Sequence, residues 1–139
     1  MATFGPVTPV LRIFDEQKAR EFYVGFLGGS VEFVHRFGEN FPIYMGVWLS
    51  GCALHLTEHH SDACPGALVR IKTDDIAAFA AVLRAREYKF ARPEAPERMP
   101  WGALELTLTD PFGNRLVFTQ DVAADERPPA MPGVTFPSS

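Results

Sequence analysis

The chain has 139 residues with a formal net charge of −4, and its two cysteines are Cys52 and Cys64. The length fits one domain with a core of its own. No basic run with interleaved aromatics suggests a nucleic-acid partner, and two cysteines are too few for a disulfide scaffold or a four-cysteine zinc site. We see no leader peptide before the first predicted strand and no apolar run that could span a membrane, so we expect a cytoplasmic protein without a membrane partner.

The first half of the chain predicts one strand, one helix and three further strands. Asp15 is a suitable helix cap, and Gly28-Gly29 ends the helix. A Ser50-Gly51 turn joins the last two strands. In chain order the predicted elements are a strand over 7–14, a helix from Asp15 to about Phe26, and strands over 30–37, 42–49 and 53–58.

After a polar linker over 59–65, the same order of elements returns. The predicted elements are a strand over 67–73, a helix capped by Asp74 or Asp75 that ends near Glu87, a short strand over 88–92, and a hairpin over 103–120. An internal repeat of this kind decides the fold class. We predict an α+β domain over 1–122, built from tandem modules at about 7–60 and 66–121, and a proline-rich tail over 123–139 without regular structure.

Four stretches resemble one family across about residues 7–120. They are Pro9-Val10-Leu11-Arg12-Ile13, Glu21-Phe22-Tyr23 with Phe26-Leu27-Gly28, Thr73-Asp74-Asp75-Ile76, and Asp110-Pro111-Phe112-Gly113-Asn114-Arg115. The chain resembles the vicinal-oxygen-chelate superfamily of glyoxalases, extradiol dioxygenases and bleomycin resistance proteins, and is most similar to the bleomycin resistance branch. The resemblance implies two βαβββ modules whose U-shaped mixed sheets surround a cleft. It also implies a homodimer with ligand clefts between the subunits.

The metal enzymes of that superfamily carry ligands at four equivalent places. Matching the motifs puts these places at Thr8, His55, Ala67 or Leu68, and Val117. A divalent ion needs several nitrogen or oxygen donors on one concave face, and only His55 is a good ligand. We therefore predict no metal, no cofactor and no catalytic residue.

Two other polar groups leave alternatives open. A metal site built from the segment His55 to His60 is disfavoured, because His55 and His59 lie about 13 Å apart along a strand. Glu105 alternates with Leu104 and Leu106, which places its carboxylate on the concave face. It could act there as a base, pair with a cationic ligand, or face solvent.

Aromatic residues suggest a binding surface. The Pro100-Trp101-Gly102 corner resembles the same text in bleomycin resistance proteins, where the Trp flanks the groove that stacks the drug's flat ring system. Tyr44 and Trp48 alternate with Gly46 onto one strand face, and Phe37 lies close by. Alternatively, Trp101 covers a core edge, and Tyr44 or Trp48 lies at the dimer interface.

We expect a metal-free binding protein of the bleomycin resistance type. It would sequester a cationic aromatic glycopeptide antibiotic, with acidic groups such as Glu39, Glu58 and Asp62 near the groove. One alternative is a metal-dependent glyoxalase-like lyase or isomerase, and another is a binder of a different small metabolite. The predicted ligand-binding residues are Trp101, Tyr44, Trp48, Phe37, Glu105 and His55.

Overall fold

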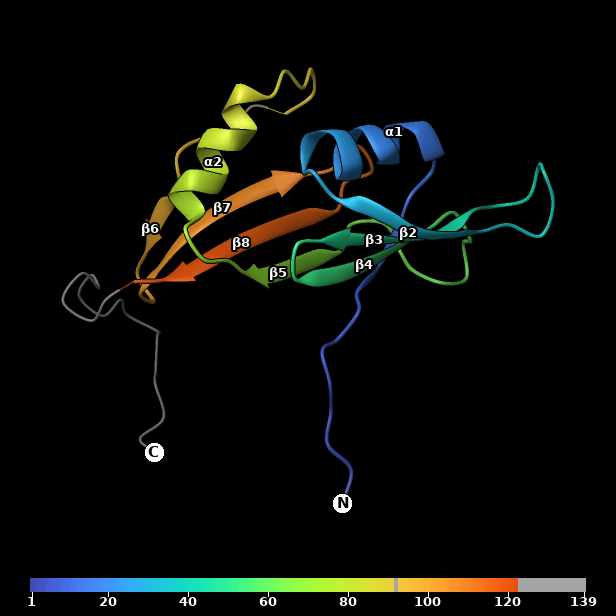
Figure 1. The fold of residues 1–139 in the computed structure, drawn as a ribbon, viewed down its shortest axis with the longest axis horizontal. Coiled ribbons are helices and arrows are strands. Elements are labelled where there is room, and N and C mark those ends of the chain that lie inside the picture. The colour runs from blue at the N-terminus through green and yellow to red at the C-terminus, as the bar shows by residue number, and fades with distance from the viewer. Residues whose placement is uncertain (92, 123–139) are drawn as a thin grey trace.

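The computed structural model describes residues 1–91 and 93–122. The tail predicted over 123–139 and Arg92, at the end of the short strand predicted over 88–92, lie outside these residues. The remaining chain forms two βαβββ modules, and Figure 1 shows the helices of both modules on the same side of the sheets. The α+β fold with tandem modules and mixed sheets is confirmed.

The first module contains one four-stranded sheet, called sheet A here, with strand order β1-β4-β3-β2. Strand β1 runs parallel to β4, and the other neighbours are antiparallel. The α-helix continues directly into a π-helix, so the predicted single helix is regular only in its first part. The elements of the first module are β1 (Val10–Arg12), α1 (Glu16–Arg20), η1 (Glu21–Phe26), β2 (Ser30–His35), β3 (Tyr44–Leu49) and β4 (Cys52–Thr57).

The second module repeats this arrangement in sheet B, with strand order β5-β8-β7-β6 and a parallel β5–β8 pair. Asp75 caps the helix: it has a left-handed backbone, and its carboxylate accepts a hydrogen bond from the Ala78 amide at 3.4 Å. The elements are β5 (Leu68–Lys72), α2 (Ile76–Ala85), β6 (Glu97–Met99), β7 (Ala103–Thr109) and β8 (Arg115–Asp121).

The two faces of each sheet differ as the two-residue period of a strand requires. On β3, Met45 and Val47 are buried against the helices, while Trp48 is exposed on the other face. On β7, Leu106 and Leu108 belong to the core, and Glu105 lies on the opposite face. We call the faces turned away from the helices the open faces of sheets A and B.

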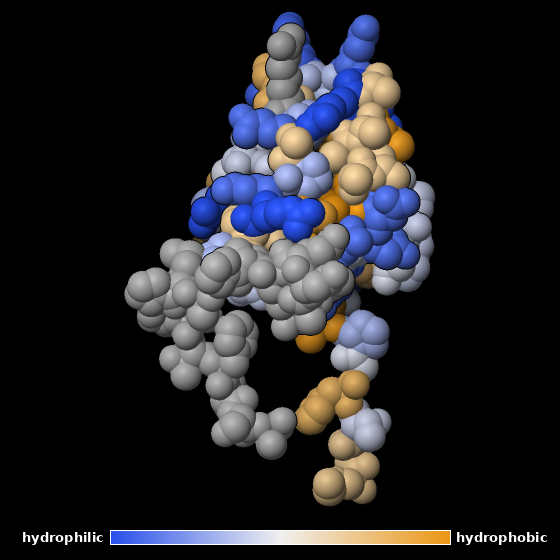
Figure 2. All heavy atoms as spheres, turned by 90° about the vertical axis from the view of Figure 1, so that its left-hand side faces the viewer, coloured by the Kyte–Doolittle hydropathy of each residue, from blue (hydrophilic) through white to orange (hydrophobic). Residues whose placement is uncertain are grey.

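Two predicted strands differ from the structure. The first strand is only Val10–Arg12, because these residues alone pair with β4, and the chain before it extends from the body with exposed side chains (Figures 1 and 2). The strand predicted over 88–92 is wrong, since β6 begins at Glu97. The Tyr88 ring instead stacks on Phe26 with centroids 4.7 Å apart, which anchors this segment as a loop in the core.

A buried carboxylate joins the modules. Asp110, which is 4% exposed, ends β7 and accepts a hydrogen bond from the Tyr23 hydroxyl of the first module at 2.6 Å. Its other donors are the backbone amides of Phe112 and Asn114 and the Asn114 side-chain amide, each at 2.8 Å. The Asn114 side chain also donates to the carbonyl of Arg12, at 2.8 Å. The Asp-Pro-Phe-Gly-Asn turn of the second module is therefore hydrogen-bonded to the first module through Tyr23 and Arg12.

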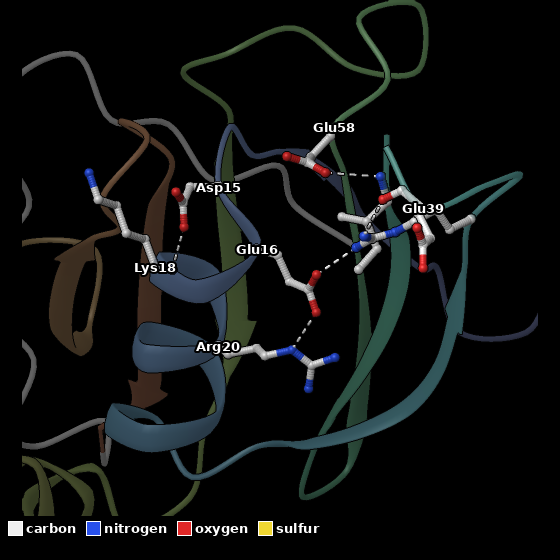
Figure 3. A network of polar contacts seen from close by, with 8 residues as sticks. Asp15, Glu16, Lys18, Arg20, Glu39 and Glu58 are labelled. Atoms are coloured by element: carbon white, nitrogen blue, oxygen red, sulfur yellow. Dashed lines mark hydrogen bonds and ion pairs between the residues drawn. The ribbon is translucent and has the colours of Figure 1, made fainter. Parts of the chain in front are cut away.

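A second polar network holds β2 against the first helix (Figure 3). Glu16 accepts hydrogen bonds from Arg20 at 2.8 Å and from Arg36 at 2.5 Å. Burial alone would raise the pKa of Glu16, but the two guanidinium groups outweigh it and lower this pKa below its ordinary value. These charges serve the fold on the helix side of sheet A.

Candidate functional site

The open face of sheet A carries a cluster of rings centred on Tyr44 and His55. The Tyr44 hydroxyl is hydrogen-bonded to Nδ1 of His55 at 2.7 Å. Phe33 stacks on Tyr44 with centroids 6.2 Å apart, and its edge contacts the His55 ring at 5.1 Å. Burial and the charge of Asp62 raise the pKa of Tyr44, so the phenol stays neutral at physiological pH.

Gly46 allows this cluster to form. A Cβ at Gly46 would lie 2.3 Å from the Phe33 ring, so only glycine lets the ring lie flat on the strand. Glycine within a strand is a known sign of such a close approach. Sequence analysis missed Phe33 as a site residue, although the position of Gly46 next to Tyr44 could have indicated it.

Two further predicted aromatics, Trp48 and Phe37, lie outside the Tyr44–His55 ring cluster. Trp48 is 43% exposed on the open face of β3. Phe37 lies beyond the end of β2, where it contacts the rings of His35 at 4.7 Å and His59 at 6.5 Å. The structure therefore brings Tyr44 and His55 into direct contact, while Phe37 lies on a separate group of imidazoles.

Trp101 is presented by a tight hairpin between β6 and β7. Met99 pairs with Ala103, and the three residues between them form the loop. Pro100 suits the second position (i+1) of a β-turn that begins at Met99, and Gly102 takes the positive φ of 88° that closes such a loop. Trp101 is thereby placed at the tip, 42% exposed, with its indole N–H donating to Oε2 of Glu105 at 2.9 Å.

Glu105 is the centre of a network on the open face of sheet B. Its Oε2 accepts hydrogen bonds from Nη2 of Arg70, from Trp101 and from the Thr119 hydroxyl, the last at 3.2 Å. Burial by itself would raise the pKa of Glu105, but these donors, led by Arg70, hold it below the ordinary value. Glu105 is therefore an ionised and already partnered carboxylate. Sequence analysis missed Arg70 and Thr119.

Other acidic groups expected near the groove are also engaged within the fold. The Glu58 carboxylate accepts a hydrogen bond from the Ile43 amide at 2.9 Å, as Figure 3 shows. Asp62 accepts one from the Thr57 hydroxyl at 2.7 Å. The structure does not gather these carboxylates around Trp101.

The residues at the expected metal positions do not fit a metal ion. Thr8 precedes β1, and Ala67, Leu68 and Val117 offer no donor side chain, so His55 is the only good ligand among these positions. In residues 1–91 and 93–122, no group of three His, Cys, Asp or Glu side chains is arranged to hold a metal ion.

A cavity of about 660 Å³ lies between the ends of the two modules, and Thr119 of the Glu105 network is one of its lining residues. None of the six predicted ligand-binding residues lines it. It is bounded by the Ser50-Gly51 turn, by α2 and by β8, and Cys52 faces it. Burial raises the pKa of the Cys52 thiol, which makes it a poor nucleophile at neutral pH.

The chain belongs to the glyoxalase superfamily. The family profile described as "Glyoxalase superfamily protein" matches residues 1–125, and strong structural similarity to bleomycin-binding and glyoxalase-family proteins agrees with it. Comparison with curated protein sequences finds no match. The resemblance stated from the motifs is confirmed.

Three solved structures illustrate this similarity. A bleomycin-binding protein from bleomycin-producing Streptomyces verticillus, complexed with copper(II)-bleomycin, is 26% identical with a TM-score of 0.65, covering 86% of this chain and 98% of that one. A superfamily member from Sphaerobacter thermophilus is 25% identical with a TM-score of 0.63, covering 85% and 98%. A glyoxalase-related enzyme from Clostridium phytofermentans is 21% identical with a TM-score of 0.72, covering 87% and 98%, and shares the fold.

Proposed function

We propose that this protein captures an aromatic small-molecule antibiotic of the bleomycin type, without a metal and without a chemical step. The observation that carries the proposal is the exposure of aromatic rings on both open faces. Trp48 and Phe33 are 43% and 42% exposed on sheet A, and Trp101 is 42% exposed beside sheet B. Large exposed rings that are held in place suit a flat ligand, since stacking contributes about 0.5–1.5 kcal/mol beyond area burial.

The orientation of Trp101 supports the same role. Its indole N–H is engaged by Glu105, so the ring is fixed before any ligand arrives. Preorganisation of this kind lowers the entropic cost of binding.

The structural similarity supports an antibiotic ligand as well. One similar structure, 26% identical, was solved with copper(II)-bleomycin bound. The finer form of the proposal is sequestration of a cationic aromatic glycopeptide by a cytoplasmic homodimer, which would confer resistance. In that assembly the open face of sheet A from one subunit and sheet B from its partner would enclose the ligand. In the described part of the chain, no helix has the length and apolar character to cross a membrane.

The metal-dependent lyase or isomerase is not proposed. It would use His55 and Glu105 as ligands. Oε2 of Glu105 already accepts hydrogen bonds from Arg70, Trp101 and Thr119 on sheet B, whereas His55 lies on sheet A. A ligand other than an antibiotic remains the alternative that the experiment below separates.

The test is a calorimetric titration of chelator-treated protein with metal-free bleomycin, on a sample of known metal content. We expect saturable binding of about one drug per subunit and at least a tenfold loss of affinity in Trp101→Ala, since tenfold corresponds to about 1.4 kcal/mol. Phe90→Ala is the matched control, because Phe90 is an exposed aromatic that is 70% exposed outside both open faces. Absence of binding, or equal loss in both variants, contradicts the proposal.

A further inference from the structure

We propose that Arg70 is a ligand-binding residue and that Glu105 is its positioning residue, so that the half-site on sheet B takes a flat aromatic group bearing a carboxylate or another anionic oxygen. The inference rests on the proposed function and names the chemistry of the ligand end that meets Trp101. It assigns Glu105 to the support of the binding surface, where sequence analysis expected a direct contact with the ligand.

The register of sheet B brings these groups together. Glu105 on β7 is paired with Thr119 on β8, and Arg70 on β5 is paired with Val117, two positions earlier on β8. All of them therefore point to the open face. Arg70 reaches across β8 to Glu105 and bonds to the same oxygen, Oε2, that holds the Trp101 indole. One carboxylate thus fixes both a ring and a guanidinium group.

The two charges of this pair are exposed very differently. The Arg70 side chain is 48% exposed, whereas the Glu105 side chain is 3% exposed. A ligand that stacks on Trp101 therefore meets the guanidinium group first, with the carboxylate beneath it. The charge that it experiences at short range is positive.

Arg70 also has hydrogen-bond donors to spare. Only Nη2 is engaged, and its other nitrogens have no partner among residues 1–91 and 93–122. A guanidinium group presents a planar fork of N–H donors that matches carboxylate oxygens, and charge-assisted hydrogen bonds are stronger than neutral ones. Because Glu105 holds one arm of the fork, little rotamer freedom is lost when the other arm binds a ligand.

The neighbouring charges define the direction of the ligand. Lys72, farther along β5, is 79% exposed and pairs with Asp121 at 3.4 Å. Glu97 on β6 lies directly opposite Glu105 and is exposed. The anionic group of a ligand is therefore placed over β5 and β8, and a cationic group, where a ligand has one, lies on the far side of Trp101.

The experiment compares three probes that share the flat pyrene ring system and differ in charge: 1-pyrenecarboxylate, uncharged 1-pyrenemethanol and 1-pyrenemethylammonium. Their affinities for the full-length protein are measured by equilibrium dialysis at neutral pH and low salt. We expect the carboxylate to bind at least fivefold more tightly than the ammonium compound. We expect Arg70→Gln to remove this preference, so that the ratio of carboxylate to ammonium affinity falls to about one. Its affinity for 1-pyrenemethanol should stay within about twofold of the wild-type value. Arg70→Lys, which keeps the charge and loses the fork, gives an intermediate ratio.

Two further variants separate a binding role from a structural one. Glu105→Gln removes the ion pair that positions the Arg70 guanidinium and keeps an acceptor for Trp101, so we expect 1-pyrenecarboxylate to lose affinity relative to 1-pyrenemethanol. Lys72→Gln removes a positive charge from the same strand, and we expect the ratio to change by less than twofold. A fold defect would weaken all three probes together and leave the ratio unchanged.

The outcomes distinguish the two proposals. Equal binding of all three probes by the wild-type protein, or a selectivity that survives Arg70→Gln, overturns the assignment of Arg70 and leaves the capture of flat ligands standing. Failure of all three probes to bind overturns this inference, whereas the bleomycin titration decides the proposed function separately.

Discussion

Two buried carboxylates on β7 and at its end, Asp110 and Glu105, are 4% and 5% exposed, yet their surroundings differ. Asp110 accepts hydrogen bonds from four donors, and all of them come from the Tyr23 side chain or from its own turn. Glu105 gathers its donors on one oxygen, and two of them, Arg70 and Trp101, remain about half exposed. Burial of a carboxylate alone therefore does not distinguish a structural group from a functional one. The exposure of its partners does.

The largest effect that we expect is on the structural carboxylate. Asp110→Ala leaves the Tyr23 hydroxyl and the Asn114 amide without their acceptor, and hydrogen bonds to charged groups contribute about 1.5–3 kcal/mol each. We predict a loss of about 3–5 kcal/mol in the free energy of unfolding, measured by urea denaturation. Asp121→Ala is the control, because its exposed ion pair with Lys72 should contribute less than about 1 kcal/mol. Equal effects of the two changes would contradict the junction role of Asp110.

The second prediction concerns the single side-chain link from the first module to Asp110. Tyr23→Phe keeps the ring in the core and removes the 2.6 Å hydrogen bond. We expect a loss of about 1.5–3 kcal/mol, because the bond has a charged acceptor. Tyr88→Phe is a matched control, since the Tyr88 hydroxyl has no hydrogen-bond partner among residues 1–91 and 93–122. If both variants lose the same free energy of unfolding, the hydrogen bond from Tyr23 to Asp110 does not stabilise the fold as predicted.

The third prediction uses acid to weaken the network around Glu105. Its pKa in the folded protein lies below the ordinary value of about 4.3 for a glutamate. The folded state therefore binds this proton less readily than the unfolded state, and the ionised pair stabilises the protein above about pH 4.3. As the pH falls through the lower folded pKa, that contribution is lost. Urea unfolding of wild type and Glu105→Gln should differ at pH 7 and converge toward pH 3, and a constant difference would contradict this.

The smallest effect should come from the Thr119 hydroxyl, which donates to Glu105 at 3.2 Å. Thr119→Val keeps the β-branched shape and leaves Arg70 and Trp101 in place. We expect a loss of about 0.5–1.5 kcal/mol in stability and a change of less than twofold in ligand affinity. A large loss of affinity with unchanged stability would instead make Thr119 a direct ligand contact.

Local patterns predicted the faces of the strands well. Alternation along β3 placed Tyr44 and Trp48 opposite Met45 and Val47, and alternation along β7 placed Glu105 opposite Leu106, as the structure confirms. The repeat of elements predicted both modules. These features depend on residues that are close in sequence, so the two-residue period of a strand is enough to predict them.

Contacts between distant residues were not predictable in this way. The bond from Tyr23 to Asp110 joins residues 87 positions apart, and the Arg70–Glu105 pair joins residues 35 positions apart. Nothing in the local pattern of β5 indicates which of its exposed cations reaches Glu105. The short β6 strand was misplaced for a related reason, because Tyr88 packs against Phe26 in the first module.

The central claim, that both open faces bind one flat ligand, has a direct test in the two tryptophans of the chain. Trp48 lies on sheet A and Trp101 beside sheet B, so a ¹⁵N-labelled sample gives two indole N–H resonances in an NMR spectrum. The account predicts that metal-free bleomycin shifts both resonances with one common dissociation constant. Saturable binding that leaves either resonance unmoved would contradict it, and binding that moves neither would place the ligand elsewhere on the protein.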